Sequence, residues 1–405
     1  MTALTPLPVE PFPYHLELVR HLREHEVELW AWFSAERTRA ERDEEVRLEL
    51  LRSTYRLEAE THPSLHAAAT EAGARLGLDE PITLYQAQGG LDLNASLAYV
   101  PGEVHLVLHG PVSGRLTPVE LLAVLGHELT HFLLLDRWRE FLVASHILAA
   151  LTRREVPDPA QLASARRFNL YAEVTCDRGA CLASCDLAAA VTALVKIETG
   201  AAEVFAESYL RQADEVFDRG KGDTRADGVT HPETFVRAWA MKVWAEEPDR
   251  ARAELARVLE GPDVLADLDF LGRERVSSLT RRLVSAFLRP RALRTVPLLA
   301  HSRLFFEDFT PSDLADPTLA EDLRSPDSKL LDYWCFVILD FAVADGELGG
   351  SALAAAAALA GELGLGDRFR ALAGKELGKG RKGLDRPAGE AAAPAPSSTL
   401  TPAGA

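Results

Sequence analysis

The chain has 405 residues, 47% of them hydrophobic and 26% charged, which is typical of a folded globular protein and excludes a wholly disordered or collagen-like chain. At roughly 150 residues per domain, this length predicts two or three domains. The 61 acidic side chains outnumber the 44 basic ones and give a formal net charge of −17, which disfavours a nucleic-acid partner.

The start of the sequence indicates no targeting segment. Residues 1–6 lack the basic and apolar regions of a signal peptide, and no uninterrupted apolar run approaches the roughly 18 residues that span a bilayer. Four cysteines do not make a disulfide framework. We therefore expect a reduced, cytoplasmic protein with no membrane span.

The first part of the chain combines helices with a few strands. Residues 1–13 are rich in proline and predict a loose arm, and the apolar spacing over 14–60 predicts two helices. A further helix is expected over 66–76, ended by Gly77. Three short apolar runs predict the strands of a small hairpin or meander, at 81–85, 97–100 and 104–108.

The rest of the chain is predicted to be helical. Helices are expected from Thr117 to about Leu259, interrupted by a Gly- and Asp-rich loop at 218–228, and again over 264–306. The composition of 310–327, rich in Pro, Asp and Ser, is typical of a linker.

A well-specified helix start precedes the most informative motif. Thr117 fits the N-cap and Glu120 completes a capping box, so a helix begins about ten residues before His127. Within that helix His127 and His131 are four residues apart and share one face, where their imidazoles can hold one metal ion. Glu128 can reach a metal-bound water without being a ligand. The alternative is a pair of surface or packed histidines, because the motif also occurs by chance.

A second helix supplies the carboxylates that such a site needs. Glu173 and Asp177 are also four residues apart on a predicted helix. Glu173 can complete a site of two histidines and one glutamate that leaves a fourth position for water. Asp177 can accept the outer N–H of a ligand imidazole and fix its tautomer. The alternative is a pair of carboxylates on a helix surface.

Residues 84–241 resemble the gluzincin metallopeptidases related to HtpX and the CAAX prenyl proteases, metallopeptidase family forty-eight. The resemblance rests on Asn94-Ala95 before a strand, Pro101-Gly102 in a turn, Glu120-Leu121 before His127-Glu128-Leu129-Thr130-His131, Glu173 with Asp177, and His231-Pro232 followed by Arg237. It implies one Zn²⁺ per chain on His127, His131 and Glu173, with Glu128 as the base that activates water.

The resemblance also implies how a substrate binds. The strand near Asn94 and Ala95 is expected to pair with an extended peptide or protein substrate through backbone hydrogen bonds. His231 is expected to donate to the oxyanion of the tetrahedral intermediate. The alternative for His231 is a histidine that caps or packs against a helix.

Two features depart from most of these relatives, which are embedded in membranes. Because the sequence indicates no membrane span, we expect neither prenylated substrates nor a role in membrane-protein quality control. Three cysteines, Cys176, Cys181 and Cys185, surround the carboxylate helix. A second zinc site or redox control is one interpretation, and we favour buried, reduced thiols that pack as small hydrophobic side chains.

Residues 330–377 form a separate helical segment that is similar to TerB-like modules, which are associated with tellurite resistance and stress systems. An apolar helix ends in Ala344-Asp345-Gly346-Glu347, and an Ala-rich helix follows it. Asp340, Asp345 and Glu347 lack EF-hand spacing, so we favour roles in turns and caps over a cation site.

These observations predict a mainly α fold: a zincin-like helical metallopeptidase domain with a small β-sheet, plus a C-terminal all-helical module. The predicted regions are 1–80 (N-terminal helices), 81–260 (zinc metallopeptidase domain), 261–309 (helical extension), 310–329 (linker), 330–378 (TerB-like module) and 379–405 (disordered tail). The predicted function is a zinc endopeptidase acting on peptides or proteins. The alternative is a non-catalytic, zinc-stabilised scaffold or stress-response protein that binds a partner through the C-terminal module.

Overall fold

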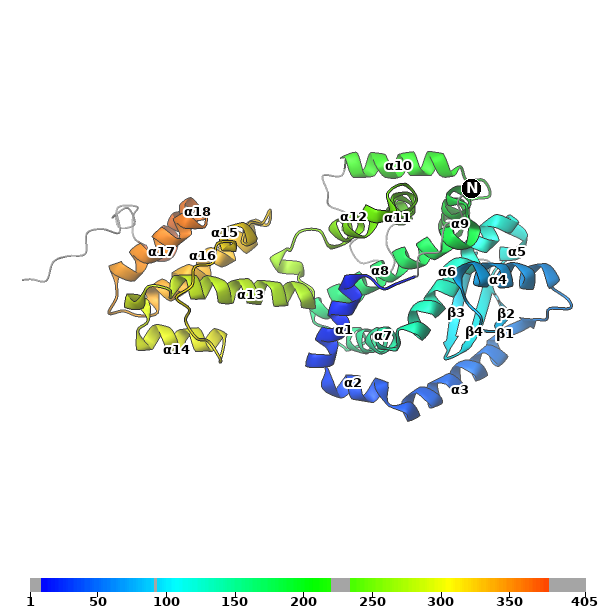
Figure 1. Cartoon of the computed structure of the whole chain (residues 1–405), viewed down its shortest axis with the longest axis horizontal. Coiled ribbons are helices and arrows are strands. Elements are labelled where there is room, and N and C mark those ends of the chain that lie inside the picture. Colours follow the sequence, from blue (N-terminus) through cyan, green and yellow to red (C-terminus); the bar gives the residue numbers. More distant parts are fainter. Residues whose placement is uncertain (1–8, 91–92, 220–233, 379–405) are drawn as a thin grey trace, which may run out of the picture. The chain divides into compact units, whose positions relative to one another are not determined.

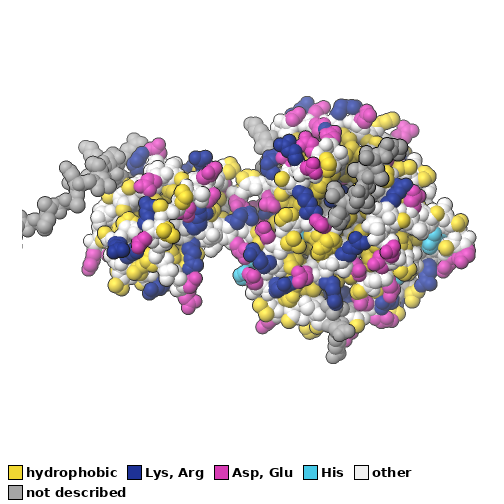
Figure 2. Space-filling view, in the orientation of Figure 1, with side chains coloured by type: hydrophobic (Ala, Val, Ile, Leu, Met, Phe, Trp, Pro, Cys, Tyr) yellow, Lys and Arg dark blue, Asp and Glu magenta, His cyan; other side chains and the backbone are white. Residues whose placement is uncertain are grey.

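The computed structural model describes residues 9–90, 93–219 and 234–378. Over these residues the fold is mainly helical with one four-stranded sheet (Figure 1), which confirms the predicted fold class. On the face that Figure 2 shows, acidic and basic side chains are interspersed over the surface. The chain divides into two compact units, Met1–Gly261 with Asp267–Leu271 and Pro262–Ala266 with Gly272–Ala405.

The first unit begins with three helices and a strand, where the sequence predicts two helices: α1 (Pro13–His25), α2 (Val27–Ser34), α3 (Glu36–Ser53) and β1 (Thr54–Leu57). Residues 9–12 are packed, because the buried Phe12 ring lies 4.7 Å from that of Tyr171 and 6.2 Å from that of Trp244. The prediction of a loose arm is wrong there, since proline content indicates irregular backbone and not exposure. Residues 1–8 lie outside the described residues.

The sheet has the strand order β1-β2-β4-β3, so that β1 and β3 are its edges. Strand β2 (Ile82–Ala87) runs parallel to β4 (Glu103–His109), while β3 (Asn94–Val100) and β4 form an antiparallel hairpin. The turn of this hairpin contains Gly102, whose φ of 71° is a left-handed conformation that favours glycine. The predicted hairpin is therefore present.

Different elements cover the two faces of the sheet. Alternate strand side chains, including Leu84 and Leu106, join the main hydrophobic core. On the opposite face Tyr85 and Val107 pack against Leu50 of α3. Because strand side chains alternate between faces, the edge strand β3 has one row toward the core and the other under α3.

The main core of this unit lies among its longer helices. These are α4 (Pro63–Leu76), α6 (Pro118–Arg137), α7 (Arg139–Thr152), α8 (Pro159–Ser184), α9 (Leu187–Thr199), α10 (Ala206–Arg219), α11 (Thr234–Glu246) and α12 (Pro248–Glu260), with the short α5 (Val112–Arg115). Helix α4 ends as predicted at Gly77, which has a left-handed φ of 69°. Of the loop predicted at 218–228, residues 218 and 219 belong to α10, and the others lie outside the described residues.

One described helix, α6, is long and apolar enough to cross a membrane by length and composition. No uninterrupted apolar run marks this helix in the sequence, because polar residues such as His127 interrupt it, although the mean hydropathy of its most apolar stretch stays at 1.3. The helix is largely buried inside the unit, with 67% of its most apolar stretch covered. A buried core helix passes the same test, so the finding is weak evidence for a membrane span.

The second unit is also helical. Its elements are α13 (Phe270–Phe287), α14 (Val296–Phe305), α15 (Leu319–Asp322), α16 (Ser328–Val343), α17 (Gly350–Glu362) and α18 (Gly366–Glu376), with 3₁₀ turns at Leu265–Asp267 and Arg291–Leu293. Asp267 and the first two residues of α13 are counted with the first unit. Residues 310–329, predicted as a linker, contain α15 and the buried Leu319 and Leu323. The predicted tail at 379–405 lies outside the described residues.

Two carboxylates considered for a cation site in this unit are hydrogen-bonded within the unit. Asp345 accepts a hydrogen bond from the Glu347 backbone N–H at 2.9 Å, as in a turn. Asp340 accepts one from His301 Nε2 at 2.6 Å. The Asp345 contact agrees with the turn role favoured from the sequence, whereas Asp340 pairs with a side chain of α14 and takes neither a turn nor a capping role in this contact.

Candidate metal centre

Helix α6 begins with the predicted capping box. The Glu120 N–H donates to the Thr117 hydroxyl at 3.3 Å, and the Thr117 N–H donates to the Glu120 carboxylate at 2.8 Å. Glu120 is buried and also accepts from Lys196 Nζ at 2.8 Å, which ties the start of α6 to α9. One turn apart further along α6, the rings of His127 and His131 have centroids 5.0 Å apart.

Helix α8 brings Glu173 to both histidines. Its Oε2 lies 3.5 Å from His127 Nε2, and its Oε1 lies 3.5 Å from His131 Nε2. Two donor atoms bound at about 2.0–2.1 Å to a tetrahedral zinc ion are about 3.4 Å apart, so these separations fit three ligands of one ion. Asp177 accepts a hydrogen bond from His127 Nδ1 at 3.0 Å, which leaves Nε2 with the lone pair that a metal needs.

A close crossing of α6 and α8 sets the spacing of these donors. Gly126 and Gly179 lie where the two helices meet. A Cβ added to Gly126 would overlap Ala183 Cβ, and one added to Gly179 would overlap the hydroxyl of Thr130. The two helices approach each other this closely because neither glycine has a side chain.

Arg237 of α11 supplies a positive charge beside the carboxylates, a role that was not predicted from the sequence. Its Nε and Nη2 donate to Asp177 at 2.8 and 2.6 Å, and its Nη2 lies 3.3 Å from Glu173 Oε2. Asp177 is only 2% exposed. Burial raises the pKa of Asp177, but Arg237 and His127 outweigh burial and hold it below its usual value. A basic residue within an otherwise apolar helical segment was the available sequence signal.

Glu128 has the environment of a proton acceptor. Burial raises its pKa to about 7, opposed by the positive charge of His127 and reinforced by the negative charge of Glu173. The Leu97 backbone N–H of β3 donates to the Glu128 carboxylate, so the unpaired edge of β3 faces this side chain. A carboxyl group with a pKa near neutrality can accept a proton and return it.

The cluster stabilises positive charge. Burial lowers the pKa of His127, but the hydrogen bonds and charges of Asp177 and Glu173 outweigh burial and raise it to about 10. Burial lowers the pKa of His131 to about 4; the negative charge of Glu173 opposes this shift, and the positive charges of His127 and Arg237 add to it. The two carboxylates therefore favour a cation at the His127 end of the site.

Asn94 and Ala95 lie at the start of the edge strand β3. They line a cavity of about 640 Å³ together with His127, His131 and Glu173. The Asn94 side chain accepts a hydrogen bond from the Ala95 N–H at 2.8 Å. The strand predicted to hold substrate therefore borders the same cleft as the candidate metal ligands.

Cys176 lies closer to the site than the sequence indicates. The donor atoms of His127, His131 and Cys176 are all within 4.8 Å of one another. Burial raises the pKa of the Cys176 thiol, and the charges of Glu173 and other carboxylates raise it further, so the thiol is neutral. The expectation of a buried thiol is confirmed for Cys176, and Cys181 is half-buried. It is wrong for Cys185, which is exposed because it lies at the C-terminal cap of α8.

The described residues end at 219 and resume at 234, so His231 lies outside them. Its role as an oxyanion donor stays a prediction. The other candidates share one cleft, which is lined by Asn94, Ala95, His127, Glu128, His131, Glu173 and Asp177.

Two imidazoles and a carboxylate that converge in this way define a candidate metal-binding site in a buried cleft. Over 201 residues the chain is 29% identical to plastoglobule-localized metallopeptidase 48, a chloroplast protein of Arabidopsis thaliana. The match covers 45% of this chain and 56% of that protein, so the chain spans about half the length of the curated relative. No family model and no solved structure matches the chain. The similarity suggests a metallopeptidase with a metal cofactor.

Proposed function

We propose that the chain is a zinc-dependent endopeptidase. The observation that carries this proposal is the position of Glu173, whose oxygens lie 3.5 Å from Nε2 of both His127 and His131. Two imidazoles and one carboxylate are a donor set of catalytic zinc sites that keep a fourth position open. The similarity to a metallopeptidase supports the same class of reaction.

Zinc on these ligands would polarise the scissile carbonyl and lower the pKa of water. Glu128, with a pKa of about 7, takes a proton from the attacking water and returns it to the leaving amine. Asp177, held by Arg237, keeps His127 in the tautomer whose Nε2 binds metal. The unpaired edge of β3, at Asn94 and Ala95, holds an extended peptide through backbone hydrogen bonds.

Glu128→Gln tests the proposal. We expect the variant to keep one zinc per chain and to lose hydrolysis of an unfolded protein by at least about 100-fold, because Gln cannot accept the proton. Glu140→Gln is the matched control, because Glu140 is the next glutamate along the chain and its side chain is 59% exposed. Hydrolysis that survives Glu128→Gln would refute the role of this base.

The alternative remains a zinc-stabilised scaffold. This alternative would be favoured if the native sequence bound one zinc per chain and hydrolysed no peptide or protein, with or without a chelator. We also propose that α16–α18 form a TerB-like module that binds a protein partner. This proposal is supported by the helical composition of that segment and its core of Trp334, Phe341 and Phe369. The relationship to HtpX and the CAAX proteases, and a cytoplasmic location, belong to the same proposal.

A further inference from the structure

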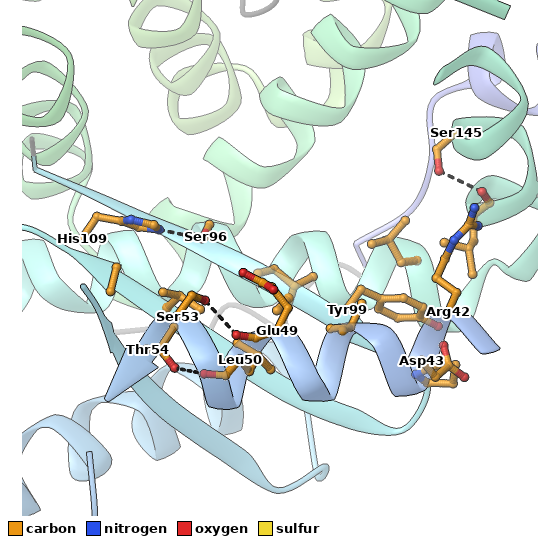
Figure 3. Close-up of a pocket in the computed structure, with 18 of the residues that line it drawn as sticks. Arg42, Asp43, Glu49, Leu50, Ser53, Thr54, Ser96, Tyr99, His109 and Ser145 are labelled. Atoms are coloured by element: carbon orange, nitrogen blue, oxygen red, sulfur yellow. Dashed lines mark hydrogen bonds between the residues drawn. The ribbon is translucent and has the colours of Figure 1, made fainter. Parts of the chain in front are cut away.

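A second cavity, of about 670 Å³, lies on the other side of strand β3 (Figure 3). Its roof is α3, its floor is the outer face of the sheet, and α7 closes one side. Apolar side chains line its length, among them Val46, Leu50, Ala98, Val107 and Leu142. Its volume lies within the range of cavities that bind ligands.

The polar groups of this cavity are mostly used inside the protein. The hydroxyls of Ser53 and Ser145 donate to backbone oxygens of their own helices, each at 2.8 Å. At one end Arg42 and Asp43 lie together, so that end presents both signs of charge. Glu49 of α3 adds a second carboxylate to the lining. With apolar side chains along its length, the cavity favours apolar groups.

The two cavities meet at strand β3. Ser96, Leu97 and Leu135 line both of them. Among the residues that the structure describes, no strand pairs with the outer edge of β3. Side chains of a strand alternate between the two faces of its sheet. A polypeptide segment added to this edge would therefore direct every second side chain toward the candidate metal centre and the others toward the second cavity.

We propose that the cavity under α3 receives alternate side chains of an extended polypeptide bound along β3, and that it selects segments with large apolar residues at those positions. This inference rests on the proposed function, which supplies the bound substrate. Helix α3 forms the roof of this cavity, whereas the proposed metal donors are carried by α6 and α8. Selectivity and chemistry are therefore assigned to different parts of the chain.

Binding to the Glu128→Gln protein loaded with zinc tests the inference without hydrolysis. Two fluorescein-labelled peptides are compared by anisotropy, one alternating Ser with Leu and one alternating Ser with Ala. We expect the Leu peptide to bind at least about tenfold more tightly, because an apolar cavity discriminates by about this factor or more. Val46→Phe and Ala98→Leu, which fill the cavity from α3 and from β3, should each reduce this ratio below about threefold.

Leu51→Phe is the matched control, because Leu51 is on α3 and 65% exposed. This variant should keep the full ratio. A ratio near one in the Glu128→Gln protein, or a ratio that survives both filling variants, would overturn the inference. A third result would also overturn it: a fatty-acid probe that binds to the Glu128→Gln protein and loses its affinity when Val46→Phe is added, while the two peptides bind equally well. Hydrolysis by the native sequence without peptide selectivity would overturn this inference alone, and selectivity without hydrolysis would overturn the proposed function alone.

Discussion

Replacing Arg237 by Met should destabilise the unit of residues 1–261. Asp177 is almost fully buried and accepts two hydrogen bonds from Arg237, at 2.8 and 2.6 Å, besides one from His127. Removing one partner of a buried ion pair costs about 3–5 kcal/mol, because the other charge stays buried without a counter-charge. Arg237→Met should therefore lower the free energy of unfolding by about this amount in the presence of a chelator.

Urea unfolding followed by circular dichroism, with and without zinc, measures this effect. Zinc supplies positive charge beside the same carboxylates, so it should stabilise Arg237→Met more than it stabilises the native sequence. Adding Asp177→Asn to Arg237→Met should recover part of the loss in chelator, because a neutral amide needs no counter-charge. The matched control is Arg250→Met, since Arg250 is 82% exposed and its ion pair should contribute less than about 1 kcal/mol.

One result would refute this reasoning. If the free energy of unfolding of Arg237→Met in chelator lay within about 0.5 kcal/mol of that of the native sequence, Arg237 would not be the counter-charge of Asp177. An equal effect of zinc on both proteins would also contradict the assigned charge balance. Either outcome would remove the link between Arg237 and the candidate metal centre.

Three further predictions concern other parts of the first unit. Lys196→Met should lower the free energy of unfolding, measured in urea, by about 3–5 kcal/mol, because it leaves the buried Glu120 without a counter-charge. A loss below about 1 kcal/mol would contradict this. Burial lowers the pKa of His15 to about 4, so the folded state resists a proton that the unfolded state binds below about pH 6.5. Stability should therefore fall as the pH drops from 6.5 toward 4, and His15→Gln should reduce that slope in urea titrations. Gly126→Ala should lower the free energy of unfolding by about 1–3 kcal/mol, because the added Cβ overlaps Ala183. It should also weaken zinc binding, measured by competition with a chelator. An unchanged zinc affinity would show that the crossing of α6 and α8 does not set the donor spacing.

The parts of the site that the sequence predicted are those with local signals. The capping box at Thr117 fixes where α6 starts, and helical periodicity then places His127 and His131 on one face. The same spacing on α8 identified Glu173. Their mutual distance is not a local property, and it was expected only because such a donor set is chemically coherent and because the segment resembles a known family.

The parts that the sequence did not predict depend on long-range packing. Arg237 reaches Asp177 across 60 positions of the chain, and no local pattern reports that contact. Phe12 was assigned to a loose arm because proline marks irregular backbone, whereas its burial depends on Tyr171 and Trp244. Strand β1 has only four residues, too few for a periodic pattern to exceed chance.

The backbone contact between Gly126 and Gly179 has a consequence for how metal binding is coupled to folding. Small zinc domains often fold only when metal gathers their ligands. Here the helices that carry the donors are already packed against each other in a large apolar core. The metal-free protein should therefore be preorganised, with little of the ion's binding energy spent on ordering the chain. Loss of the metal would then abolish the proposed hydrolysis without unfolding the protein, and adding the metal back would restore hydrolysis without a chaperone.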